Sequence, residues 1–98
     1  MSRYKLSPMA RLDLQEIWLF TFTTWSENQA NTYQKSLTKT FELIVSEPEI
    51  GISIDFIRKG YRRFQFKSHY IYYRVEEGQL IVIIRILHFR MNQIKIAE

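Results

Sequence analysis

Two histidines and several arginines in the second half of the chain are the side chains best suited to chemistry. His69 and His88 are the only groups in the sequence whose ordinary pKa lies near neutrality. His88 lies between Arg85 and Arg90, so its imidazole could act as a general acid or base at a phosphodiester whose charge the guanidinium groups stabilise. The alternative is a strand-end histidine that makes one structural hydrogen bond, and residue type alone favours this alternative.

Arg85 is unusual because it interrupts the otherwise apolar run 80–87. An arginine in such a strand needs an acidic or phosphate partner to offset the loss of water around its charge. The sequence leaves two sources open: an Asp or Glu of the chain itself, or a bound molecule. Arg62, Arg63 and Arg74 add to a cationic surface, although Arg62 and Arg63 must point to opposite faces of a strand.

Three tyrosines precede Arg74 in the same stretch. Tyr70, Tyr72 and Tyr73 beside a basic residue resemble surfaces that stack the bases of single-stranded RNA. Tyrosine is also a good strand residue, and this structural interpretation is favoured, with Tyr73 facing the core.

Motifs for metals and cofactors are absent from the sequence. There is no nucleotide-binding loop, zinc signature, pair of metal ligands or nucleophile elbow. There is also no cysteine, which excludes disulfides and thiolate ligands. We therefore expect neither a metal ion nor a cofactor.

Size and composition indicate one packed domain that covers residues 1–98. The hydrophobic content is 46% and the net charge only +4, which disfavours disorder. The N-terminus lacks the apolar core of a signal peptide, and the longest wholly apolar run, 80–84, is far shorter than the roughly 20 residues of a membrane-spanning helix. We therefore expect a soluble cytoplasmic protein without membrane contact.

Charge is distributed unevenly along the chain. From Arg58 onward there are nine Lys/Arg and three Asp/Glu, whereas the first 57 residues hold five basic and seven acidic side chains. Such asymmetry bears on binding partners more than on fold. The basic segment 60–92 is therefore the expected location of a functional surface.

Capping and turn residues predict the elements that position these side chains. Ser7 and Pro8 begin a first helix, the capping box at 26–29 begins a second, and Pro48 ends it. Gly78 allows a tight turn between the last two strands. The predicted elements are a strand at 3–6, helices at 8–25 and 26–47, a loop at 49–59, and strands at 61–66, 69–75 and 79–88. This β–α–α–β–β–β order predicts an α+β fold in which an N-terminal helical hairpin packs on a mostly antiparallel sheet.

The first helix is apolar around more of its circumference than one contact with a sheet requires. Its helical stripe consists of Ala10, Leu14, Ile17, Thr21 and Trp25. Trp18, Phe20 and Phe22 lie off this stripe, which indicates either a second contact within the fold or a surface that a binding partner covers.

Several segments match one known superfamily in order and spacing. The most specific is Arg-Ile-Leu-His-x-Arg-Met at 85–91, which follows Gly-Tyr-Arg at 60–62. The other matching positions are Tyr4 to Ser7, Ala10, Asp13, Leu14, Ile17, Gln29, Ala30, Tyr33, Leu37, Pro48, Gly51 and the run from His69 to Tyr73. Over about 4–92 the chain thus resembles a type II toxin of the ParE/RelE superfamily, and within it the ParE branch. The superfamily fold is the β–α–α–β–β–β layout, so resemblance and residue spacing predict the same architecture.

The resemblance implies a growth-inhibiting toxin that a cognate ParD-like antitoxin neutralises within a hetero-oligomer. In this superfamily the C-terminal segment of the antitoxin commonly packs along the helical hairpin and a sheet edge. On that basis Trp18, Phe20 and Phe22 are the expected antitoxin contacts.

The superfamily also implies two alternative activities. ParE-type toxins bind DNA gyrase and trap a cleaved-DNA state, whereas RelE-type toxins cut mRNA on the ribosome without a metal. A nuclease of this kind would use His88, Arg85, Arg62 and Arg90. However, Phe89 follows His88 where related nucleases place a hydroxyl or a basic cluster.

The resemblance therefore favours gyrase poisoning by binding, without catalysis. The expected target contacts are Arg63, Arg74, Arg90, Met91 and Asn92, on the basic sheet and in the segment that follows it. A third interpretation stays open, in which the chain no longer intoxicates and survives as a binding partner or autoregulator.

Overall fold

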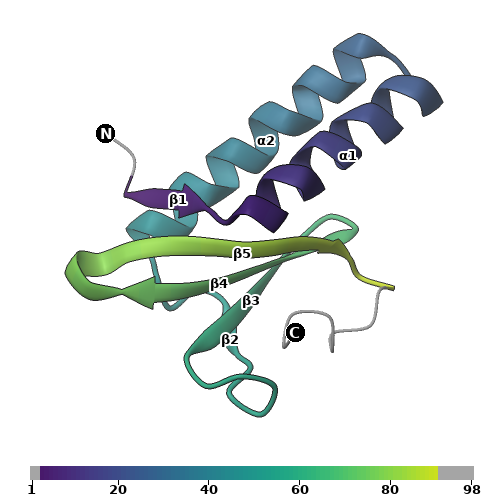
Figure 1. The fold of residues 1–98 in the computed structure, drawn as a ribbon. Coiled ribbons are helices and arrows are strands. Elements are labelled where there is room, and N and C mark those ends of the chain that lie inside the picture. Colours follow the sequence, from purple (N-terminus) through teal and green to yellow (C-terminus); the bar gives the residue numbers. More distant parts are fainter. Residues whose placement is uncertain (1–2, 91–98) are drawn as a thin grey trace.

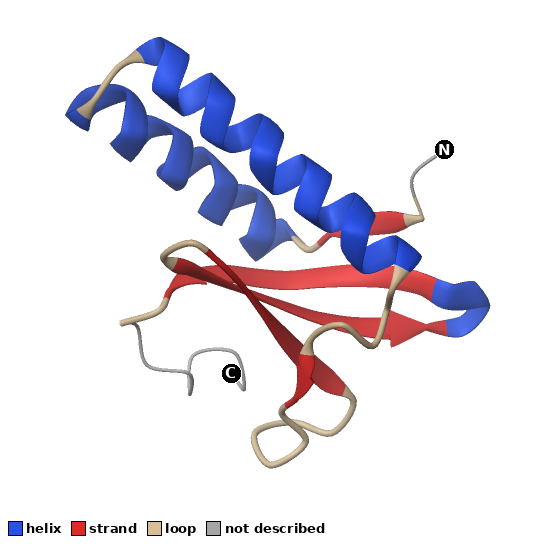
Figure 2. Ribbon diagram, turned by 180° about the vertical axis from the view of Figure 1, so that it is seen from behind, coloured by secondary structure: helices blue, strands red, loops and turns tan. Residues whose placement is uncertain are grey.

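The computed structural model describes residues 3–90 and shows a helical hairpin lying on one face of a five-stranded sheet (Figures 1 and 2). The elements are β1 (Tyr4–Leu6), α1 (Pro8–Thr24), α2 (Glu27–Ser46), β2 (Ile52–Ser53), β3 (Tyr61–Phe66), β4 (His69–Glu76), a single 3₁₀ turn (Glu77–Gln79) and β5 (Leu80–His88). The strand order is β1-β5-β4-β3-β2, with β1 parallel to β5 and the other neighbours antiparallel. The predicted α+β fold is confirmed, and β2 is a short addition inside the segment predicted as a loop.

The first helix is fixed to the sheet through its N-cap residue, Ser7. Ser7 Oγ accepts a hydrogen bond from the Ala10 N–H at 3.0 Å, which satisfies one of the free donors at the helix start. The same hydroxyl donates to the Ile84 carbonyl at 2.7 Å, and the Ser7 N–H donates to the Ile83 carbonyl at 2.9 Å. These bonds place the start of α1 directly beside β5 at the point where β1 ends.

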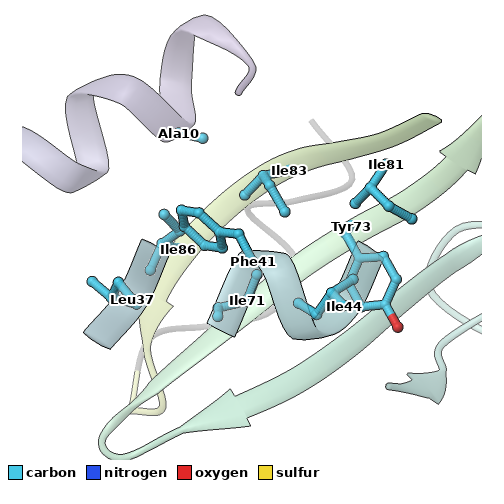
Figure 3. Close-up of a cluster of buried hydrophobic side chains, with 9 residues drawn as sticks. All are labelled: Ala10, Leu37, Phe41, Ile44, Ile71, Tyr73, Ile81, Ile83 and Ile86. Atoms are coloured by element: carbon cyan, nitrogen blue, oxygen red, sulfur yellow. The ribbon is translucent and has the colours of Figure 1, made fainter. Parts of the chain in front are cut away.

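The main core fills the space between the hairpin and the sheet (Figure 3). Leu37, Phe41 and Ile44 recur at helical spacing on α2, and each is at most 1% exposed. They pack against residues of β4 and β5 that point to the same face: Ile71, Tyr73, Ile81, Ile83 and Ile86. Full burial of such side chains contributes about 1.5–3 kcal/mol each.

A smaller cluster lies on the opposite face of the sheet. It consists of Ile54, Tyr61, Tyr72 and Leu87, with Ile57, Tyr70 and Ile84 packed against it. Adjacent Tyr72 and Tyr73 are 1% and 0% exposed, because each belongs to the core on a different face. This supports the structural interpretation of the tyrosines, and Tyr73 faces the main core as predicted.

Gly51 is required where the chain enters β2. The buried Tyr73 hydroxyl donates to the Pro48 carbonyl at 2.7 Å and accepts from the Gly51 N–H at 2.9 Å. A Cβ atom at position 51 would lie 2.7 Å from that hydroxyl and 3.0 Å from the Arg63 carbonyl. Only a residue without a side chain allows this close approach.

Candidate functional site

A groove of about 520 Å³ lies between the hairpin and one end of the sheet. It is open because the tip of the hairpin, where α1 joins α2, projects past the sheet (Figures 1 and 2). The lining from α1 and its C-cap residue includes the apolar side chains of Ile17, Phe20 and Trp25, here called the wall. The lining from α2 and the sheet includes the polar side chains of Tyr33, His69 and His88, here called the floor. Such a combination fits an amphipathic ligand or peptide segment.

A buried ion pair joins the first helix to the last strand at the base of the groove. Arg85 donates to both carboxylate oxygens of Asp13, from Nε at 2.8 Å and from Nη2 at 3.0 Å. The Ile86 N–H donates to the same carboxylate at 2.9 Å. The hydrogen bond that Arg85 donates to Asp13 raises the pKa of Arg85 further above its ordinary value. The chain itself therefore supplies the acidic partner that Arg85 needs.

Asp13 has a second structural role at the edge of the sheet. β1 ends at Leu6, which pairs with Ile83, so within residues 3–90 the following part of β5 has no neighbouring strand on that side. The Asp13 carboxylate satisfies the Ile86 N–H that a longer β1 would otherwise bind. Asp13 is only 7% exposed, so these partners replace the hydrogen bonds to water that its carboxylate loses on folding.

The two histidines meet on the floor of the groove. His69 and His88 are directly opposite each other in the β4–β5 pair, and their ring centroids are 5.6 Å apart. Tyr33 Oη and His69 Nδ1 are hydrogen-bonded at 2.9 Å. Burial, followed by the nearby His88, lowers the pKa of His69, and Asp13 opposes this in part. His88 Nδ1 accepts a hydrogen bond from the Arg90 N–H at 3.2 Å. This is the kind of bond expected if His88 is a structural residue at the end of a strand.

Acidification from about pH 7.5 to 5.5 is expected to lower the free energy of unfolding, and less so in a His69→Gln variant. Because the folded pKa of His69 is below the ordinary 6.5, the unfolded chain binds more protons in this range. The contribution of neutral His69 is complete above the unfolded pKa and is lost as pH falls from that value through the folded one. Urea unfolding at several pH values gives the pH dependence of the free energy of unfolding for the wild type and for His69→Gln. Equal pH dependence in the two proteins would contradict a lowered pKa of His69.

The proposed nuclease residues are not gathered around one point. His88 and Arg85 line the groove, but Arg85 is held by Asp13. Arg62 lies on β3, two strands from β5, and donates to the Gly51 carbonyl at 2.6 Å. The Arg90 guanidinium lies over the Phe89 ring, 5.6 Å from its centroid.

The three expected antitoxin contacts divide into two groups. Phe20 is 65% exposed and lines the groove. Trp18 and Phe22 stack at 5.1 Å, and the Trp18 indole N–H donates to Asn31 Oδ1 at 3.0 Å. Phe22 is 42% exposed, whereas Trp18 is half-buried and ties α1 to α2.

Trp25 is a groove residue that sequence reasoning missed. It shares the helical stripe of the core residues, yet it is 71% exposed. The reason is that α1 ends at Thr24, beyond the edge of the sheet (Figure 1). The sequence did hold a signal for its exposure: Trp25 is a large aromatic residue at the end of the predicted first helix and directly before Ser26, which caps the second.

The expected target contacts lie mainly away from the groove. The Arg63 guanidinium is 4.1 Å from the centroid of Tyr70. Arg74 donates to Glu76 at 2.7 Å, and this bond raises its pKa. Met91 and Asn92 lie outside the described residues.

Neither a spanning helix nor a metal cluster occurs in residues 3–90. No helix there is long and apolar enough to cross a membrane. No three His, Asp or Glu side chains in that part of the chain are grouped so that they could hold a metal ion.

Comparison with known proteins decides the family. The model of the ParE toxin of type II toxin-antitoxin system, parDE, matches residues 4–93. The chain belongs to the ParE toxin family. This confirms the resemblance, and the chain is a ParE toxin of a type II toxin–antitoxin system.

Individual relatives agree with the family assignment. This ParE toxin is 41% identical over 91 residues to Toxin ParE1 of Mycobacterium tuberculosis, with 93% of each chain covered. It is 40% identical over 92 residues to Toxin ParE1 of Caulobacter vibrioides, with 94% of each covered. A solved structure of the chromosomal ParDE TA system from P. aeruginosa has the same fold, with a TM-score of 0.74 at 18% identity over 89% of this chain and 98% of that one.

Proposed function

We propose that this ParE toxin inhibits growth in the cytoplasm by binding and poisoning DNA gyrase, without being an enzyme itself. The observation that favours a gyrase-binding toxin over a nuclease is the pairing of Arg85 with Asp13. The Nε and Nη2 atoms of Arg85 donate to the two carboxylate oxygens of Asp13, so the charge of Arg85 is already paired with an acid of the chain instead of being available to a cleaved phosphodiester. Arg85 is the one Lys or Arg among the described residues that line the groove, so this lining offers no unpaired Lys or Arg to a metal-independent nuclease, and a binding toxin fits it better.

We further propose that a cognate ParD-like antitoxin neutralises the toxin by covering α1 and the groove. Large apolar side chains are exposed in the first turns of α1, in its C-terminal half and at its C-cap: Met9, Leu12, Leu19, Phe20, Phe22 and Trp25. Exposed large apolar side chains concentrated on one element of a small protein are typical of a protein-binding site. An amphipathic antitoxin segment would place its apolar side against this surface and its polar side over Tyr33 and His69.

Gyrase assays beside a translation assay test the target. With purified toxin, gyrase, supercoiled plasmid and ATP, we expect broken DNA to accumulate while mRNA in a translation reaction stays intact. Toxin premixed with its antitoxin is the control, and it should leave the DNA unbroken. mRNA cut in the ribosomal A site without DNA breaks would support a RelE-type nuclease instead. If neither molecule is damaged, the chain is not an active toxin.

A further inference from the structure

The segment 54–60, between β2 and β3, carries the most exposed large hydrophobic residue in the described chain. Phe56 is 81% exposed. The segment extends from the sheet on the side away from the helical hairpin (Figures 1 and 2). A surface here is therefore separate from the groove and from α1.

The segment is held in one conformation by its own contacts. Ile54 is 0% exposed, and its carbonyl accepts from the N–H groups of Ile57 at 2.8 Å and Arg58 at 3.1 Å. The Asp55 carboxylate accepts from the Gly60 N–H at 2.8 Å, and Gly60 has a φ of +85°. Phe56 is thus displayed on a preformed turn, which reduces the ordering cost of binding.

The surroundings of Phe56 are basic. Arg58 and Lys59 come two and three residues after it, with the Arg58 guanidinium 5.6 Å from the centroid of the Tyr61 ring. Arg63 lies on β3 opposite Ile52 of β2. Within segment 54–60 the one acid is Asp55, whose carboxylate accepts a hydrogen bond from the Gly60 N–H. An aromatic side chain within positive charge fits an acidic surface that has an apolar pocket.

A protein fits this surface better than a nucleic acid. Single-stranded nucleic acids bind where successive aromatic rings offer open faces to the bases. The segment 54–60 instead packs over the aromatic rings of this sheet face, because Tyr61 and Tyr72 are only 7% and 1% exposed. The Tyr70 ring is already stacked with Arg63. A single exposed aromatic side chain such as Phe56 is typical of a hot-spot residue in a protein–protein interface.

We propose that segment 54–60 is the anchor by which the toxin binds its target, with Phe56 entering an apolar pocket on an acidic protein surface. This inference rests on the proposed function, because the target protein that it names is DNA gyrase. Arg58 and Lys59 steer the encounter, whereas Phe56 sets the lifetime of the complex.

The test measures binding of full-length toxin variants to immobilised gyrase. Phe56→Ala is expected to weaken the affinity by about 30-fold or more, the effect of losing one interface hot spot. Lys59→Glu is expected to slow association at low salt and to have little effect at high salt. Leu43→Ala is the matched control, because Leu43 is 40% exposed but lies on α2. The urea unfolding midpoint and antitoxin affinity of Phe56→Ala should equal those of the wild type.

The outcomes separate the two proposals. If wild-type toxin binds gyrase and Phe56→Ala binds equally well, the anchor is wrong and the proposed function stands. If wild-type toxin does not bind gyrase, the proposed function fails, and the anchor assignment fails with it. A labelled single-stranded oligonucleotide is the second probe, and its loss of binding in Phe56→Ala, with gyrase binding retained, would assign the surface to nucleic acid and overturn the inference.

Discussion

Replacing Asp13 by alanine is expected to lower the free energy of unfolding by about 3–5 kcal/mol, a large part of the roughly 5–15 kcal/mol of a typical domain. The change leaves the Arg85 guanidinium, whose side chain is 16% exposed, without its two carboxylate bonds. It also leaves the Ile86 N–H unpaired at the edge of β5. Urea unfolding of both proteins at neutral pH measures the difference.

Two further variants distinguish the loss of stability caused by breaking the ion pair from the loss caused by any substitution in α1. Glu16→Ala changes another acid of α1 that lines the groove, and we expect an effect within about 0.5 kcal/mol, as for an exposed site. Asp13→Leu combined with Arg85→Met removes both charges, so it should be more stable than Asp13→Ala. A loss below about 1 kcal/mol in Asp13→Ala would show that the buried pair does not stabilise the fold.

The elements of this fold were predictable because their signals are local. Ser7 and Ser26 each accept from the N–H three residues later, as their positions before apolar helical stripes predicted. Gly78 has a φ of 72° in the turn between β4 and β5, where the sequence called for a residue that tolerates positive φ. The two-residue β2 carries no local signal, since it is a strand only through its pairing with Arg62 and Arg63.

The candidate site was less predictable because it depends on contacts between distant segments. The sequence shows that Arg85 needs a partner, but Asp13 is 72 positions away and only the fold brings them together. Exposure of Trp25 follows from where the hairpin passes the edge of the sheet, which helical spacing does not encode. Phe56 lies in a predicted loop, where a single aromatic residue has no periodicity to interpret.

The second large effect is expected at the groove, in a variant that carries both Phe20→Asp and Trp25→Asp. These residues are 65% and 71% exposed and form the apolar wall, so the change should cost little stability. If each is a hot spot worth about 2 kcal/mol, the antitoxin affinity should fall about 1,000-fold. Titration calorimetry or surface binding with the purified antitoxin measures this change.

The pair Trp18→Asp and Phe22→Asp is the informative comparison, because both residues were expected contacts on sequence grounds. Trp18 also hydrogen-bonds Asn31, so this variant should lose stability in the hairpin as well as affinity. Leu43→Asp on α2 controls for an added charge at an exposed apolar position.

The groove assignment predicts a toxin that escapes neutralisation while it keeps its activity. The Phe20→Asp and Trp25→Asp variant leaves the segment 54–60 intact on the other side of the sheet (Figure 1). It should therefore still break DNA with gyrase, and antitoxin at concentrations that silence the wild type should no longer protect the plasmid. Wild-type antitoxin affinity in this folded variant would place the antitoxin elsewhere, whereas joint loss of antitoxin and gyrase binding would mean that the two partners share one surface.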